Sequence, residues 1–315
     1  MKLQTMRLIE QPGKLLDRPW LQFLQLVHVD TISCSAYIPA ADKTEGRFRI
    51  AKVARMLTYI ISVWECRNFW LSLVVNDLHL RYRRSVLGVG WSLAHPLATT
   101  LVLGSVFHVI FDRPIREYMP CLLCGLGCWA YLTGVITQGC QTYINAEPYI
   151  RQHTLPLAVY PLRTTLGVMI NFLIALVLVV ILSMGLRGWA KTPDMGALIL
   201  ALPVLLAFGW SMGVLAGFVN VVFRDTQHIL DVVFQIMFYL TPIIYPIEVL
   251  AKTPVGSIVA FNPLTPFIDL IRDPVINGCP ASPATWSSAV VITLILGVLA
   301  SLSLSQQQRR VILYL

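Results

Sequence analysis

Long runs without charged residues dominate the hydrophobic and polar pattern of this chain. Five stretches contain no Asp, Glu, Lys or Arg, and they cover residues 85–111, 118–146, 164–186, 195–223 and 274–308. A sixth stretch, 226–247, contains a single charge, Asp231. Because a helix that crosses a bilayer needs about 20 consecutive apolar residues, the pattern predicts an all-α integral membrane protein with six transmembrane helices. We expect these near 88–111, 119–143, 164–186, 197–222, 228–246 and 284–305.

The segment before the first predicted crossing has a helical pattern but carries too many charges to span. Apolar residues recur at helical spacing from Leu57 to Leu78, and Glu65, Arg67 and Asp77 interrupt them. Such a pattern is typical of a helix that lies in the membrane interface. We therefore expect a cytoplasmic interfacial amphipathic helix within 56–87, before a transmembrane domain over 88–308.

The two ends of the chain differ from this central domain. Residues 1–55 show no steady period and indicate a poorly organised N-terminal extension, and one interpretation is that translation starts at Met56. Residues 309–315 form a short tail. Six crossings put both ends on one side, and more arginines lie near the membrane on that side than on the other. The positive-inside rule then predicts cytoplasmic N and C termini.

Between the fifth and sixth predicted crossings lies a long apolar segment, 248–283, that is interrupted by Pro254, Pro263, Pro266, Pro274 and Pro280. Proline removes a backbone donor and interrupts helices. We therefore expect a short re-entrant segment on the outer side, rather than another crossing.

The composition supports the bilayer as the solvent. Hydrophobic residues make up 56% of the chain and charged residues 13%, with a mean hydropathy of +0.69. Soluble domains carry about 25% charged residues, so a soluble enzyme is excluded. The net charge of +8 does not predict a nucleic-acid partner, because the basic residues mostly flank the predicted crossings.

The sequence also lacks the motifs of several function classes. It contains neither a P-loop nor an HExxH motif, and few ionisable residues lie in the crossings. This disfavours a membrane enzyme or an ion-coupled pump, so energy for transport must come from another subunit. Cys121, Cys124 and Cys128 share a helical face, which we interpret as packing rather than metal binding. We expect no metal and no cofactor in this chain.

Three arginines, Arg81, Arg83 and Arg84, stand where the interfacial helix meets the first crossing. Guanidinium groups at headgroup depth can bind phosphate or diphosphate in a bidentate manner. The alternative is that they only anchor the chain by the positive-inside rule.

Five stretches resemble, in order and spacing, the membrane subunits of bacterial type-2 ABC exporters for polysaccharides, which handle O-antigen, capsule and teichoic acid. They are DLHLRYRRSVLGVGWSLAHPL (77–97), NAEPYIRQHTLPLAVYPLR (145–163), VFRDTQHI (222–229), FQIMFYLTPIIYP (234–246) and FNPLTPFIDLIRDPVING (261–278). The resemblance implies a non-catalytic permease of the bacterial inner membrane that forms a homodimer. It further implies two copies of a separate ATPase, which bind ATP and Mg. The implied cargo is a polyprenyl-diphosphate-linked polysaccharide that moves out of the cytoplasm.

The same resemblance implies which residues couple the permease to the ATPase. They are Glu147, Tyr149 and Arg151 in the first cytoplasmic loop, and Arg224 and Asp225 in the second. Pro148 stands where the family often has a helix-forming residue, so we expect the docking helix to begin later than in relatives.

Two further features concern the membrane helices. Sugar rings stack on aromatic faces, and Trp129, Tyr131 and Tyr239 are candidates to line the export path, although helix packing is the commoner role of such rings. Two consecutive GxxxG steps place their glycines on one face of the fourth crossing, where another helix can approach closely. They are Gly209, Gly213 and Gly217, and the approaching helix belongs either to the same chain or to a second copy.

Two other functions remain open from the sequence. One is a type-2 ABC exporter of a drug or of a smaller lipid-linked molecule. The other is a membrane-embedded enzyme that modifies glycans or lipids.

Overall fold

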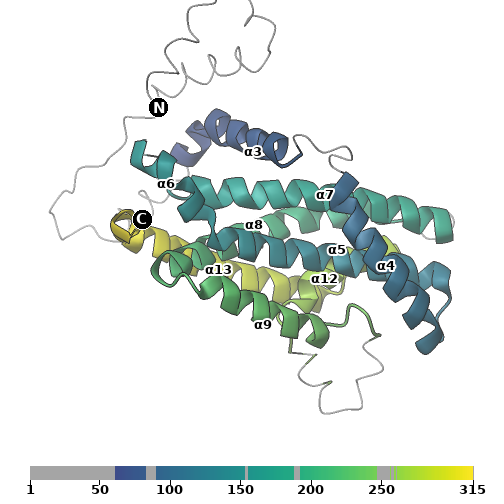
Figure 1. Ribbon diagram of the computed structural model, residues 1–315. Helices are drawn as coiled ribbons and strands as arrows, with labels where there is room; N and C mark the ends of the chain where they lie inside the picture. Colours follow the sequence, from purple (N-terminus) through teal and green to yellow (C-terminus); the bar gives the residue numbers. More distant parts are fainter. Residues whose placement is uncertain are drawn as a thin grey trace, which may run out of the picture.

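The computed structural model describes residues 61–82, 90–152, 155–187, 192–246, 256, 259 and 261–314. Over these residues the chain is helical and has no strand (Figure 1). The predicted extension 1–55, the possible start at Met56 and the arginines Arg83 and Arg84 lie outside the described residues.

Residues 61–65 are helical, and nine α-helices and one π-helix with described bounds follow them. They are α3 (Arg67–Tyr82), α4 (Gly90–Ile110), α5 (Ile115–Cys140), α6 (Thr142–Gln152), α7 (Val159–Arg187), α8 (Met195–Val222), α9 (Thr226–Leu240), α12 (Thr265–Arg272), η2 (Asp273–Asn277) and α13 (Pro283–Tyr314). Among the described residues, α4, α5, α7, α8 and α13 contain stretches long and apolar enough to cross a membrane. This agrees with the prediction of an all-α integral membrane protein.

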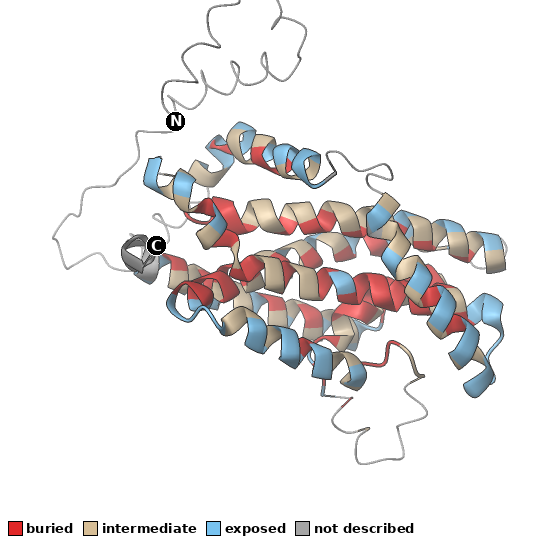
Figure 2. Cartoon of the chain, in the orientation of Figure 1, coloured by how far each residue is buried: buried red, intermediate tan, exposed pale blue. Residues whose placement is uncertain are grey.

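Helix α5 forms the centre of the bundle. It contacts α4, α7, α8, α9 and α12, and 67% of its apolar stretch is buried, against 11% for α4 (Figure 2). Apolar side chains on the outer faces of α4, α9 and α13 are exposed, among them Val109, Ile236 and Leu294. A helix with this pattern buries one side in protein and leaves the other for lipid or a second subunit.

The fifth predicted crossing is shorter in the structure than in the sequence pattern. Helix α9 ends at Leu240 and has 15 residues, which is about 22 Å at the rise of an α-helix. The backbone of Thr241 is extended, because a residue that precedes proline, here Pro242, is disfavoured in the helical region. The apolar pattern continues to residue 246, but the helix does not.

The glycine face of α8 packs inside this chain. A Cβ atom on Gly139 of α5 would lie 2.7 Å from the Cα of Gly213, and one on Gly217 would lie 2.8 Å from the ring of Tyr143. A Cβ on Gly209 would lie 2.6 Å from the Tyr131 hydroxyl. The absence of side chains at these positions therefore lets α8 approach α5 closely.

The part of the proline-rich segment that the structure describes, residues 261–282, contains two short helices. The side chains of Phe267, Leu270 and Ile271 in α12 are fully buried, and α12 packs against α5, α8 and α13. The Phe267 ring lies 4.2 Å from that of Phe208, centre to centre. Gly278, with φ of 66°, takes the left-handed conformation that ends this segment. Helix α12 is thus part of the core of the bundle.

Helix α6 follows α5 almost without interruption. Pro148 does not mark the start of this helix, since α6 begins at Thr142 and includes this proline. The amide of Asn145 donates to the carbonyl of Gln141 at 2.9 Å, so the first turn is already formed before the proline. Pro148 lacks a backbone N–H, so the helix loses one backbone hydrogen bond at this position and continues.

Candidate functional site

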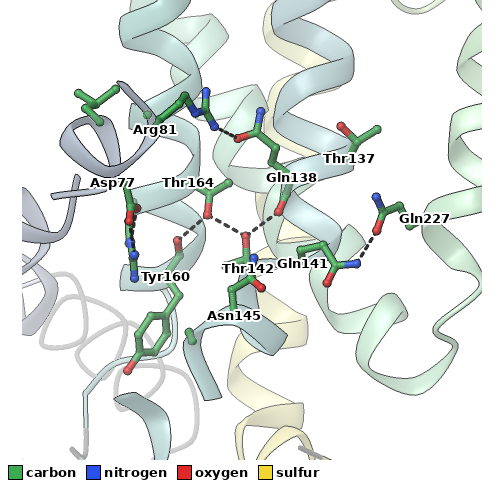
Figure 3. Close-up of a pocket in the computed structure, with 14 residues that line it drawn as sticks. Asp77, Arg81, Thr137, Gln138, Gln141, Thr142, Asn145, Tyr160, Thr164 and Gln227 are labelled. Carbon is green, nitrogen blue, oxygen red and sulfur yellow. Dashed lines mark hydrogen bonds and ion pairs between the residues drawn. The ribbon is translucent and has the colours of Figure 1, made fainter. Parts of the chain in front are cut away.

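A cavity of about 560 Å³ is lined by residues of α3, α5, α6, α7 and α9 (Figure 3). Most of the side chains that line it are polar. The lining residues are Asp77, Leu78, Arg81, Thr137, Gln138, Gln141, Thr142, Asn145, Ala146, Tyr160, Arg163, Thr164, Gly167 and Gln227. We call this cavity the α3 pocket.

Uncharged hydrogen-bonding groups form the floor and walls of the α3 pocket. The side chain of Gln141, between α5 and α6, donates to that of Gln227 on α9. The hydroxyls of Thr142 on α6 and Thr164 on α7 are 2.9 Å apart. These bonds connect the α5–α6 junction to α9 and α6 to α7. Carboxamides and hydroxyls can each both donate and accept hydrogen bonds to a ligand.

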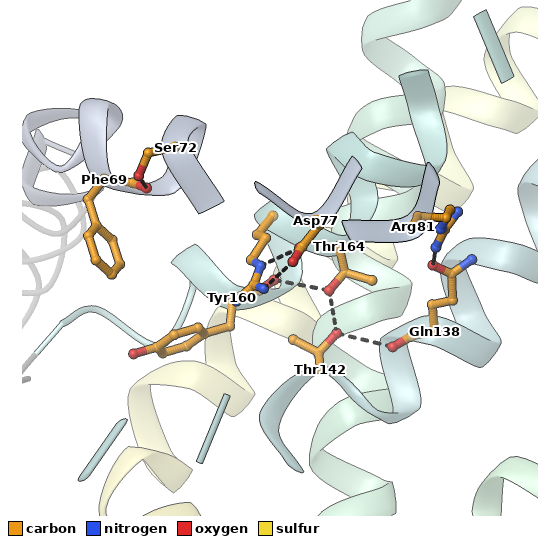
Figure 4. Close-up of polar contacts among 9 residues, drawn as sticks. Phe69, Ser72, Asp77, Arg81, Gln138, Thr142, Tyr160 and Thr164 are labelled. Atoms are coloured by element: carbon orange, nitrogen blue, oxygen red, sulfur yellow. Dashed lines mark hydrogen bonds and ion pairs between the residues drawn. The ribbon is translucent and has the colours of Figure 1, made fainter. Parts of the chain in front are cut away.

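The charged groups of the pocket are partly neutralised by an ion pair. Nε of Arg163 donates to Oδ2 of Asp77 at 2.5 Å, and Nη2 donates to Oδ1 (Figure 4). The Arg163 guanidinium also lies over the Tyr149 ring, 5.6 Å from its centre. The side chain of Arg163 is 17% exposed and that of Asp77 39%. This bidentate pair attaches α3 to α7.

Arg81 lies at the rim of the pocket. It is exposed, in the last turn of α3, and its Nη2 donates to Oε1 of Gln138 at 2.9 Å. Of the three arginines predicted to bind a diphosphate, it is the one that the structure describes.

The residues predicted to contact an ATPase lie at one end of the bundle. Helix α6 buries Thr142, Tyr143 and Ala146 against the bundle, whereas Arg151 is exposed and its Nε donates to Oε1 of Glu147 at 2.9 Å. Arg224 and Asp225 are exposed in the turn between α8 and α9, at the same end as α6 (Figure 1).

A buried amide connects this end of α8 to α5. Nδ2 of Asn220 donates to the carbonyl of Cys140 at 2.8 Å, and the Asn220 side chain is fully buried. Because Cys140 is the last residue of α5, the bond fixes the end of α8 beside the start of α6.

The three aromatic candidates for the export path separate into two environments. Trp129 is buried, with its ring 6.1 Å from Phe234 and 5.7 Å from Phe238. Tyr131 is also buried, and its hydroxyl donates to the carbonyl of Leu205 at 2.8 Å. Tyr239 on α9 is 65% exposed. The first two rings thus join helices of this chain, and Tyr239 presents a free face.

Two thirds of this chain match a known protein family. The model of the ABC-2 type transporter family matches residues 68–275, which extend from α3 through most of η2. This chain belongs to the ABC-2 type transporter family. Its members are membrane permeases that work with an ABC ATPase, in agreement with the resemblance drawn from the motifs.

Curated relatives of this ABC-2 transporter are named as export permeases or as a transport protein. One is an O-antigen export system permease protein of Myxococcus xanthus, 26% identical over 66% of this chain and 80% of the relative. A permease of the same name from Klebsiella pneumoniae is 28% identical over 64% of this chain and 78% of its own length. A polysialic acid transport protein of Escherichia coli is 21% identical over 71% of this chain and 87% of its own.

Sequence reasoning about this ABC-2 transporter missed most of the α3 pocket. Gln138, Gln141 and Gln227 do not ionise, so the pattern of ionisable residues does not include them. Uncharged carboxamides in apolar helices were the signal that was available. Asp77 and Arg163 are 86 positions apart, so no local sequence pattern predicts that they pair.

Proposed function

We propose that this chain is the permease subunit of an ATP-driven ABC exporter that moves a polyprenyl-diphosphate-linked polysaccharide from the cytoplasm across the inner membrane. The observation that carries the proposal is the similarity to an O-antigen export permease and to a polysialic acid transport protein, over about two thirds of this chain. The chain itself binds no nucleotide and catalyses no reaction in this proposal.

The proposed assembly is a homodimer with two ATPase subunits. Exposed apolar faces on α4 and α9 suit contact with lipid or with the second permease. In this proposal, α9 together with residues 241–246 forms the remaining crossing, α3 lies in the cytoplasmic interface, and both termini are cytoplasmic.

Coupling to the ATPase is assigned to α6 and the α8–α9 turn. The half-buried Glu147 and Tyr149 and the exposed Arg151, together with Arg224 and Asp225, would contact the ATPase. The opposite face of α6 includes Tyr143, whose ring lies against Gly217 of α8. A displacement of α6 would therefore push directly on α8, since close-packed contacts transmit strain.

Recognition of the carrier is assigned to Arg81, Arg83 and Arg84. Arg81 is exposed beside the α3 pocket, where a lipid phosphate at the surface of the bilayer can reach it. A planar guanidinium binds two phosphate oxygens at once, so it suits the diphosphate of the carrier. Tyr239 is the aromatic candidate for contact with the moving glycan.

Deletion of the gene tests this function. Lipid-linked glycan should accumulate inside the cell and surface glycan should be lost, and the gene supplied in trans should restore export. A strain whose partner ATPase is inactive should show the same defect. Unchanged surface glycan in the deletion strain would reject the proposed function.

A further inference from the structure

The α3 pocket has the chemistry of a site for a neutral, hydroxyl-rich ligand. Its lining includes four carboxamides and three threonine hydroxyls, from Gln138, Gln141, Asn145, Gln227, Thr137, Thr142 and Thr164. Its volume of about 560 Å³ is within the range of about 300–1,000 Å³ for small-molecule sites. Of the two cations that the described lining residues contain, Arg163 is paired with Asp77 and Arg81 stands at the rim.

A phosphate group does not match the interior of this pocket. Phosphate oxygens only accept hydrogen bonds, so a phosphate could use the amide NH2 and hydroxyl donors of the pocket but would leave its carboxamide oxygens and the Asp77 carboxylate, which also only accept, without a partner. A sugar ring carries hydroxyls that donate as well as accept, so it can use both ends of each carboxamide. The interior therefore favours a saccharide over the diphosphate.

The position of Arg81 gives the ligand a direction. Arg81 contacts Gln138 at the rim, so a diphosphate held by Arg81 would have its first sugar directly beside the carboxamides. Resting on the proposed function, we propose that the α3 pocket binds the sugar residue nearest to the diphosphate of the lipid carrier. The pocket then distinguishes a glycosylated carrier from a bare one.

Two glycines of α7 allow a matched test of this site. Gly167 lines the α3 pocket, and a Cβ atom there would meet no atom within 4 Å. Gly185, near the other end of the same helix, also has no atom within 4 Å of a Cβ. Leucine at either position replaces a poor helix former by a good one, but only Gly167→Leu places its side chain in the pocket.

The experiment uses the complete complex of permease and ATPase in nanodiscs. Binding of two radiolabelled lipids is measured: polyprenyl diphosphate that carries a single N-acetylhexosamine, and polyprenyl diphosphate without sugar. The intact complex should bind the glycosylated lipid about tenfold more tightly, as expected for two net hydrogen bonds. Gly167→Leu should abolish this preference, and Gly185→Leu should retain it.

A second variant tests the inference if Gly167→Leu does not fold. Gln227→Met removes one carboxamide at similar side-chain volume and should reduce the preference without affecting the bare lipid. Equal affinity of the intact complex for the two lipids would overturn the inference while leaving the proposed function in place. A full preference in a folded Gly167→Leu complex would also overturn it. Failure of both lipids to bind would instead contradict the proposed function, on which the inference rests.

Discussion

The contact between Gly139 of α5 and Gly213 of α8 gives the sharpest prediction about the fold. In Gly139→Ala the new Cβ would lie 2.7 Å from the Cα of Gly213. Carbon atoms pack at about 3.5–4.0 Å, so the helices must separate by about 1 Å. The opposing atom belongs to the backbone of α8 and cannot rotate away, and overpacking of this kind costs about 1–3 kcal/mol.

Gly127→Ala is the matched control on the same helix. A Cβ atom at Gly127 would meet no atom within 4 Å, so this variant should gain only the helix propensity of alanine, up to about 1 kcal/mol. Thermal unfolding of the purified chain in detergent measures both. We expect Gly139→Ala to melt below the unsubstituted chain and Gly127→Ala at or above it. Equal melting temperatures for the two variants would refute the close approach of α5 and α8.

Three further predictions concern the residues that serve transport. Arg81→Ala should lower surface glycan more than it lowers the amount of inserted protein, with Arg81→Lys between the two because lysine lacks the bidentate fork; equal loss of both quantities would mean that Arg81 only anchors the chain. Asp77→Asn should weaken the attachment of α3 by about 1 kcal/mol, a modest value because Asp77 is partly exposed, and should thereby lower export of surface glycan. The double variant Asp77→Arg with Arg163→Asp, which exchanges the two charges, should restore part of that export. Charge reversal at Glu147 or Arg151 should separate ATP hydrolysis from transport in vesicles, and normal export by both variants would remove α6 from the ATPase contact.

The membrane helices could be predicted from the sequence because apolar length alone specifies them. Runs without charge predicted the helices that became α4, α5, α7, α8 and α13, since a chain in lipid must satisfy its backbone internally. The end of α9 could not be predicted this way. Hydropathy continues through Pro242 to residue 246, and the helix ends at Leu240 for a conformational reason that hydropathy does not measure.

The candidate site was only partly accessible from the sequence. Arg81 stood out because it is charged beside an apolar helix, and the glycine face of α8 stood out by its regular spacing. Whether that face meets the same chain or a second copy depends on tertiary packing, and the structure puts α5 against it. The ion pair between Asp77 and Arg163 closes a long loop in the chain, so no local pattern contains it.

Reconstitution in vesicles tests the central claim most directly, which is that this chain forms a conduit powered by a separate ATPase. The purified chain is placed in liposomes with lipid-linked glycan, with and without its ATPase and ATP, and the glycan on the far leaflet is measured with an impermeant lectin. The account predicts movement only when the chain, the ATPase and ATP are all present. Directional movement by the chain alone would contradict it.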